Sequence, residues 1–233
     1  MCAIRVPSEA RILLVRHSSA LQLRYGVSVS EAISEMAEFP VSELSVYVED
    51  ECTRHLLLKA LPASIRQRVR VTTCGSWEDV IRFLAMFRRD PTLGHVAGIL
   101  DGERQGQEAE HAKTLCRYLG GTITDADRDW FIERHFYLPG GVSPEYYLCA
   151  LGTDPAFREQ LASELNAELE VVEDFFRGPT TTNPKALAYN LGQRVGLDED
   201  QTKAALITAA IRCRPDDFRP LVGFLQSRLD AET

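Results

Sequence analysis

Hydrophobic and polar residues alternate differently along successive parts of the chain, and each pattern predicts its own kind of structure. Residues 11–25 (RILLVRHSSALQLRY) predict two short strands around a Ser-Ser turn. Residues 28–39 predict a helix, because Ala32, Ile33 and Met36 fall on one face. We expect residues 1–42 to be a lead-in made of a strand pair and a helix, because so short a piece cannot bury a core of its own.

From residue 43 the pattern changes to a regular alternation of strand and helix. Strands are predicted in LSVYVED, RVRVTTC, HVAGILD and RHFYLPG, and helices in ECTRHLLLKAL and SWEDVIRFLAMF. Ser76 is the expected N-cap of the second helix, and Trp77 joins its apolar stripe. This order predicts an α/β fold with a parallel sheet and right-handed crossovers over residues 43–141.

Beyond Gly141 the chain is predicted to be helical. Three helix starts carry the same signal, a capping residue followed by proline at the first helical position: Ser143-Pro144, Asp154-Pro155 and Asn183-Pro184. Two further amphipathic runs, QTKAALITAAI and FRPLVGFLQSRL, follow near the end. We therefore expect residues 142–233 to form a C-terminal helical subdomain after the α/β domain.

Composition narrows the range of functions. The chain of 233 residues is 45% hydrophobic and has a formal net charge of −8, so it lacks the broad basic surface of a protein that coats DNA. A metal-dependent nuclease is still compatible with this charge, because bound cations neutralise its acidic residues. The six cysteines stand singly, the histidines have no zinc-binding spacing, and no apolar run is long enough for a membrane span. These features predict a cytoplasmic protein with reduced thiols and no membrane association.

Acidic residues follow two of the predicted strands at the point where each strand ends. Glu49 and Asp50 end the first strand, and Asp101 and Glu103 follow the third. Ligands bind at the carboxyl ends of the strands in a parallel sheet. Carboxylates that converge there would destabilise the fold unless a cation were bound, and oxygen ligands favour Mg²⁺ or Mn²⁺. Taken alone, each pair also fits an ordinary strand end, with a helix cap at Asp50 and a turn at Asp101.

Two families share this layout. The string VEDE is similar to the opening of response-regulator receiver domains, in which Asp101 would be the phosphoacceptor. Over residues 43–150 the sequence more closely resembles the Toprim domain of the nucleases of the overcoming-lysogenization-defect (OLD) family. Glu49, Gly75, and the pair Asp101 and Glu103 match the Toprim pattern, and LPGGVSPE resembles an OLD segment. The chain departs from that pattern at Glu103, where Asp is usual, and at Thr53, where many OLD nucleases have Glu.

The resemblance implies phosphodiester hydrolysis with one or two Mg²⁺ or Mn²⁺ ions. It implies these metal ligands: Glu49, Asp50, Asp101, Glu103 and Glu145. Glu49 is alternatively a general acid or base, and Glu145 is also explained as an acid that stabilises the start of a helix. Lys185 is the best-placed candidate to stabilise developing negative charge, although it also fits an ordinary exposed surface lysine, and Lys203 and Arg177 are weaker alternatives.

The resemblance also implies partners. OLD-type nucleases carry an ATPase domain, yet this chain has no phosphate-loop motif GxxxxGK[ST]. We therefore expect an ATPase domain or a separate ATPase subunit as a partner, DNA as the substrate, and possible homo-oligomers, in the setting of phage defence. Two other hypotheses stay open: a Toprim-like assembly or nucleic-acid-binding subunit without catalysis, and a receiver-like phosphoacceptor.

Overall fold

The structure is a computed structural model that describes residues 4–5, 11–17, 20–25, 43–178 and 183–231. The chain divides into two units, residues 1–43 and 44–233, and each is described by itself. In the first unit, an antiparallel sheet in the order β1-β2-β3 consists of β1 (Ile4–Arg5), β2 (Arg11–His17) and β3 (Ala20–Tyr25). The predicted strand pair is confirmed, whereas the helix predicted for residues 28–39 lies outside the described residues.

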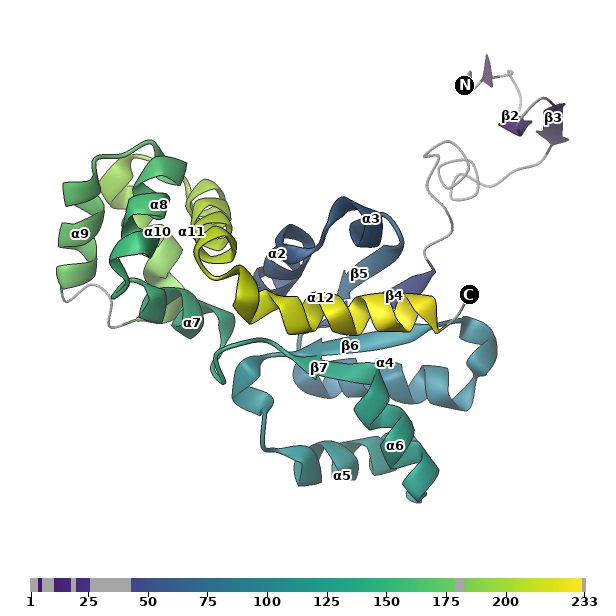
Figure 1. Cartoon of the computed structure of the whole chain (residues 1–233). Helices are drawn as coiled ribbons and strands as arrows, with labels where there is room; N and C mark the ends of the chain where they lie inside the picture. The colour runs from purple at the N-terminus through teal and green to yellow at the C-terminus, as the bar shows by residue number, and fades with distance from the viewer. Residues whose placement is uncertain (1–3, 6–10, 18–19, 26–42, 179–182, 232–233) are drawn as a thin grey trace. The chain divides into compact units, whose positions relative to one another are not determined.

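The second unit is built on a parallel sheet of four strands in the order β5-β4-β6-β7 (Figure 1). Its strands are β4 (Leu44–Val48), β5 (Val69–Thr73), β6 (Val96–Leu100) and β7 (His135–Tyr137). Every residue of β6 is buried, as expected for a central strand covered on both faces. The predicted α/β fold with a parallel sheet is therefore confirmed.

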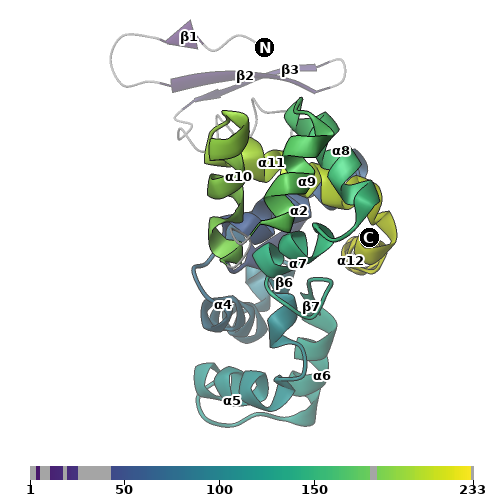
Figure 2. The ribbon, with the colours of Figure 1, turned by 90° about the vertical axis from the view of Figure 1, so that its left-hand side faces the viewer.

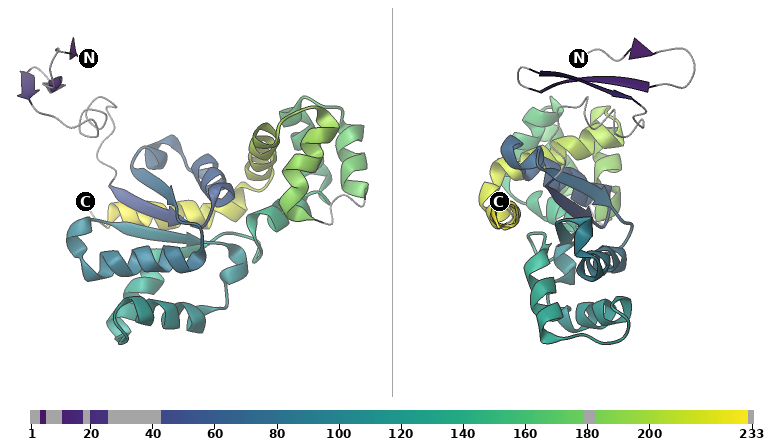
Figure 3. Two further views of the ribbon diagram at one scale, coloured as in Figure 1. Left: turned by 180° about the vertical axis from the view of Figure 1, so that it is seen from behind. Right: turned by 90° about the vertical axis from the view of Figure 1, so that its right-hand side faces the viewer.

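Helices cover both faces of this sheet (Figure 3). One face packs on α2 (Glu51–Ala60), with the short α3 (Ala63–Arg66) after it, and the other on α4 (Trp77–Arg89), α5 (Glu108–Tyr118) and α6 (Asp125–Arg134). Two 3₁₀ turns, η1 (Pro91–Leu93) and η2 (Gly102–Arg104), flank β6.

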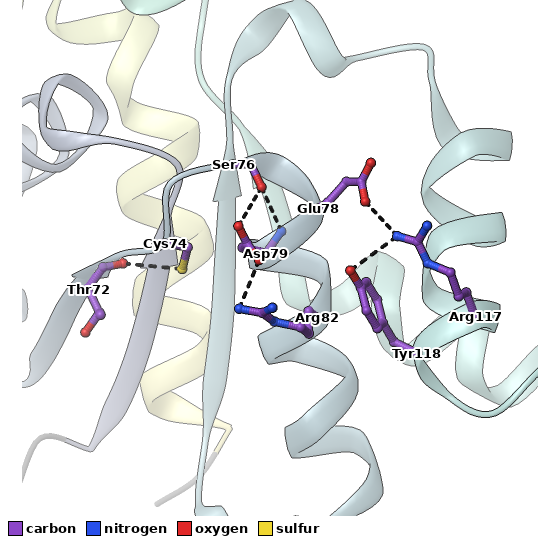
Figure 4. A network of polar contacts seen from close by, with 8 residues as sticks. All are labelled: Thr72, Cys74, Ser76, Glu78, Asp79, Arg82, Arg117 and Tyr118. Carbon is purple, nitrogen blue, oxygen red and sulfur yellow. Dashed lines mark hydrogen bonds and ion pairs between the residues drawn. The ribbon is translucent and has the colours of Figure 1, made fainter.

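The start of α4 shows how local sequence fixes a helix. Ser76 is its N-cap, and the Ser76 hydroxyl oxygen accepts the Asp79 N–H at 3.2 Å (Figure 4). Two acidic residues in the first turn interact favourably with the helix dipole. One of them, Glu78, also receives a hydrogen bond of 2.6 Å from Arg117 on α5, which ties the two helices together.

The rest of the second unit is helical, and all of its helices but the last group beside the sheet (Figure 2). They are α7 (Pro144–Leu151), α8 (Pro155–Leu165), α9 (Leu169–Arg177), the 3₁₀ turn η4 (Pro184–Ala186), α10 (Leu187–Val195), α11 (Glu199–Cys213) and α12 (Pro215–Asp230). All three predicted starts coincide with helical turns, although Ser143 makes no side-chain cap bond and Asn183 opens a 3₁₀ turn instead of an α-helix.

The last helix, α12, returns to the sheet. It packs against α2 and β7, where the rings of Phe136 and Phe224 stack with centroids 5.3 Å apart. A second link joins α12 to α7, because the Tyr147 hydroxyl donates to Asp217 at 2.6 Å. One hydrophobic cluster consequently runs from β4 through α12. The predicted boundary between residues 43–141 and 142–233 stays a prediction.

A chain of polar rings lies on the opposite face of the sheet. The Tyr137 hydroxyl is 3.0 Å from His111 Nδ1 and 3.2 Å from His135 Nε2, and His135 Nδ1 is 2.7 Å from the Phe131 carbonyl oxygen. His135 must donate to that carbonyl, so Tyr137 donates to His135 and accepts from His111. Burial, followed by the nearby His135, lowers the pKa of His111 to about 4. Both histidines are therefore neutral near pH 7.

Two expectations from composition can be compared with the described residues. The five cysteines in this part of the chain are free thiols. None of the helices that the structure describes combines the length and apolar character needed to cross a membrane.

Candidate active site at the strand ends

The acidic residues that follow the strands come together because their strands are neighbours. In the parallel pair of β4 and β6, Val48 lies opposite Ile99, so Glu49 comes level with Leu100, the residue directly before Asp101. The Glu49 carboxylate accepts the backbone N–H of Asp101 at 2.9 Å. This bond joins two residues that are 52 positions apart in the sequence.

Asp101 is the most constrained acid of the group. Its side chain accepts a hydrogen bond of 2.8 Å from the Thr53 hydroxyl on α2, and the residue is only 7% exposed. Burial raises the pKa of Asp101 to about 8, and the charge of Glu49 contributes next, while the Thr53 bond acts in the opposite direction. Burial also raises the pKa of Glu49, against the Asp101 N–H bond and the charge of Arg104. The charge of Arg104 therefore does not offset the cost of holding these two carboxylates close together and partly out of water.

Two glycines allow the backbone to bring these acids together. Gly75, with φ of +100°, follows β5 and donates its N–H to the Glu49 carbonyl at 2.7 Å. Gly102 follows Asp101, and a Cβ there would lie 2.8 Å from the carbonyl oxygens of Leu138 and Val142. The segment LPGGVSPE therefore packs directly on the turn that carries Asp101.

The remaining predicted ligands occupy different surroundings. Asp50 is the N-cap of α2, where its side chain accepts the Thr53 N–H at 2.8 Å. Glu103 is half exposed and lies 3.9 Å from Arg104. Glu145 is in the first turn of α7, and its charge, with that of Asp50, also raises the pKa of Asp101. Glu145 and Asp50 thus lie within electrostatic reach of the central pair.

Two lysines from the helical part reach the same region. Glu145, Lys185 and Lys203 line a small hollow of about 40 Å³ together with Cys52, the residue that precedes Thr53. Lys185 is exposed on η4, and Lys203 on α11 lies 3.6 Å from Glu199. The weaker alternative, Arg177, pairs instead with Glu173 and Asp174 on its own helix.

Known proteins were compared with this chain. No family model matches it, and no curated protein matches it. The solved structures that match are C-terminal regions of OLD proteins. One from Xanthomonas campestris pv. campestris has a TM-score of 0.48 at 14% identity, over 82% of this chain and 98% of that one. The OLD region from Burkholderia pseudomallei has a TM-score of 0.43 at 16% identity, over 83% of this chain and 100% of that one. The sequence motifs resemble the same family of proteins. Structural likeness with these TM-scores assigns no activity to the chain.

The chemistry of the strand-end acids fits a small hard cation. Proteins commonly hold Mg²⁺ by one or two carboxylates, with water and substrate phosphates in the other positions, and the site supplies the half-buried carboxylate of Glu49 and the buried one of Asp101. Within the described part of the chain, no group of three or more His, Cys, Asp or Glu side chains is arranged to hold a metal. The roles of Asp50, Glu103 and Glu145 as further ligands stay predictions.

The motifs did not reveal all of this site. Thr53 stands out in the sequence only as a departure from the OLD pattern, yet its hydroxyl contacts Asp101. Arg104 directly follows the DGE motif, and its charge acts on Glu49. The position of Arg104 directly after the DGE motif was the only sequence signal that could have placed it at the site. No sequence signal pointed to Cys52.

Proposed function

We propose that this chain is a divalent-metal-dependent endonuclease that hydrolyses phosphodiester bonds in DNA. The observation that supports this most directly is the pair Glu49 and Asp101, held together at the ends of neighbouring parallel strands. When bound, a Mg²⁺ or Mn²⁺ ion would polarise the phosphate and lower the pKa of an attacking water molecule. One or two ions are compatible with this proposal.

Each residue of the site has a separate task in this proposal. Glu49 and Asp101 hold the metal, and the Thr53 hydroxyl fixes the orientation of the Asp101 carboxylate. Glu49 also holds the Asp101 backbone, so the two ligands keep one spacing. Lys185 or Lys203 provides positive charge beside the acids for the negative charge that develops on the phosphate.

The resemblance to OLD proteins extends the proposal to partners. We propose that an ATPase domain or a separate ATPase subunit regulates cleavage by this chain, and that the two act together in phage defence. The alternative, a Toprim-like assembly or nucleic-acid-binding subunit without catalysis, is favoured by one observation: Thr53, where many OLD nucleases have Glu, offers Asp101 a hydroxyl and not a further carboxylate.

Cleavage of supercoiled plasmid tests the proposal. Purified chain is incubated with Mg²⁺, Mn²⁺ or EDTA beside Asp101→Asn, with Asp129→Asn on the exposed face of α6 as the matched control. We expect metal-dependent nicking that is lost in Asp101→Asn and kept in Asp129→Asn. Lys185→Gln and Lys203→Gln are compared in the same assay. The variant that has lost the lysine in contact with the phosphate should nick plasmid about 100-fold more slowly.

Two results would decide against catalysis by this chain. A folded protein that binds Mn²⁺ but leaves plasmid intact, alone and with an ATPase partner, would support the assembly subunit. Nicking that persists at full rate in Asp101→Asn would show that the activity comes from a contaminant or another site.

A further inference from the structure

One stretch of the chain has a charge opposite to that of the whole. Residues 52–77 contain no Asp or Glu, although the chain as a whole has a formal net charge of −8. The same stretch holds five basic residues: Arg54, Lys59, Arg66, Arg68 and Arg70. It spans α2, α3 and β5, which directly follow the strand-end acid Glu49. Arg54 is paired with Glu51, whereas Lys59 and Arg66 lie at one groove, where positive charge on an acidic protein attracts a polyanion.

Part of this basic stretch lines a surface groove between α2, α3 and α11. The groove has a volume of about 250 Å³ and an apolar floor of Leu58, Ala204 and Ile207. Its rim carries His55, Lys59 and Arg66, with Asp200 as the one acidic lining residue among those described. An apolar floor beneath a cationic rim suits a ligand that has both a flat apolar part and a negative charge.

The cations of the rim are largely free to bind such a ligand. Lys59 makes no ion pair with any described residue, and it is exposed. Arg66 donates to the Leu58 carbonyl at a long 3.5 Å, and His55 Nε2 lies 3.7 Å from Glu51. Neither contact is strong enough to hold the side chain away from a phosphate, because exposed contacts of this length contribute little.

The groove lies along the same helix that begins at the acid site. Asp50 caps α2, Thr53 contacts Asp101, and Lys59 is in the last turn. Lys59 comes nine positions after Asp50, which corresponds to about 14 Å along a helix. A strand of nucleic acid advances about 3.4 Å per nucleotide in a duplex, so a few nucleotides span this distance.

We infer that the groove binds one nucleotide of the nucleic acid strand a few positions from the bond that is cut. The base lies on the Leu58, Ala204 and Ile207 floor, and Lys59 and Arg66 each contact one of the two phosphates that flank it. This inference rests on the proposed function, since it names where the substrate strand runs after it leaves the acids. The groove would hold substrate in register and would increase affinity without taking part in the chemical step.

Metal-free binding tests the groove separately from cleavage. Fluorescence anisotropy of a short labelled single-stranded oligonucleotide is measured in EDTA across a range of salt concentrations. Lys59→Gln/Arg66→Gln should weaken binding at least about tenfold and lower the salt slope by about 1.4, because two phosphate contacts are lost. The matched control, Lys113→Gln/Arg89→Gln, removes the same charges from exposed positions, where Arg89 also makes only a 3.5 Å contact with a carbonyl. It should change affinity less than twofold.

A second variant tests the floor without removing any cation. Ala204 is exposed on α11, so Ala204→Glu should fold and place a carboxylate in the groove. We expect it to weaken oligonucleotide binding about tenfold, whereas Ala126→Glu at an exposed site on α6 should not. Equal affinities and salt slopes for groove and control variants would overturn the inference. Equal binding of poly-glutamate and oligonucleotide at the groove would also overturn it and would indicate an acidic protein partner.

The two proposals can fail separately. If the wild type never nicks plasmid but the groove variants bind oligonucleotide more weakly, the groove is a nucleic-acid-binding site and the nuclease proposal is refuted. If Asp101→Asn abolishes nicking but the groove variants nick plasmid with the KM of the wild type, the nuclease proposal holds and the groove inference is refuted.

Discussion

Replacing Asp101 by Asn should make the metal-free protein more stable at neutral pH. The side chain is nearly buried beside Glu49, and its pKa is about 8 against an ordinary value of 3.8. Between these two values the folded protein holds a proton that the unfolded chain has released. Folding stability therefore falls as the pH rises from about 4 to about 8. An Asn side chain keeps an oxygen for the Thr53 hydroxyl and carries no such penalty.

The magnitude follows from the size of the shift. At 1.36 kcal/mol per pKa unit, the penalty at pH 7 is at most about 4 kcal/mol, and it disappears below about pH 4. We expect a smaller net gain for Asp101→Asn, because the new amide N–H₂ also needs a partner in a buried site. Even about 2 kcal/mol is a large part of the stability of an ordinary domain.

Urea unfolding in EDTA, followed by the fluorescence of Trp77 and Trp130, measures this effect. Wild type, Asp101→Asn and the exposed control Asp129→Asn are compared at pH 5 and pH 8. The advantage of Asp101→Asn should be larger at pH 8, and Asp129→Asn should stay close to wild type at both values. An Asn variant that is no more stable than wild type at pH 8, or whose advantage does not change with pH, would falsify the reasoning.

Three further outcomes are expected. Mg²⁺ or Mn²⁺ at 100 times its Kd should stabilise the wild type by about 2.7 kcal/mol, and a thermal-shift titration should show much less for Asp101→Asn. The pKa of His111 is about 4 in the folded protein, against an ordinary value of 6.5. As the pH falls below 6.5, His111 therefore binds a proton in the unfolded chain before it does so in the folded one, and the free energy of unfolding decreases. His111→Gln should therefore lose about 2 kcal/mol less than wild type between pH 7 and pH 5 in urea unfolding. Gly102→Ala should cost about 1–3 kcal/mol, because its Cβ would lie 2.8 Å from backbone oxygens, while Gly223→Ala in the open middle of α12 should stabilise by about 0.5–1 kcal/mol. Equal midpoints for the two glycine variants in the same denaturation assay would contradict that account.

The parallel sheet and the pairing of its acids were accessible from sequence for a physical reason. Strand and helix periods differ, so β4, α2, β5, α4 and β6 could be identified from their hydrophobic patterns. Parallel strands end at one edge, so Glu49 and Asp101 could be expected to meet, and the structure places them in contact.

Most of the parts that were missed depend on tertiary contacts or lack local signals, whereas α6 was missed although Thr124 and Asp127 form a capping box at its start. Helix α5 follows Gln107, which makes no side-chain cap bond, so its start has no signature in the sequence. The bond from Thr53 to Asp101 joins positions 48 apart, and only the packing of α2 on the sheet creates it. Tyr146 and Tyr147 are indistinguishable by pattern, yet only Tyr147 is buried, because its hydroxyl reaches Asp217 on α12.

The return of α12 to the sheet has a consequence for how the protein is made. Phe218, Leu221, Leu225 and Leu229 are fully or almost fully buried, although they come more than 100 residues after the strand-end acids. A chain that leaves the ribosome in order would expose Glu49 and Asp101 long before the helix that covers their sheet. Until residues 215–230 emerge, the apolar face of the sheet would be open to chaperones and to other nascent chains. Packing around the acid site would thus be completed only when α12 has been made, more than 100 residues after the acids themselves.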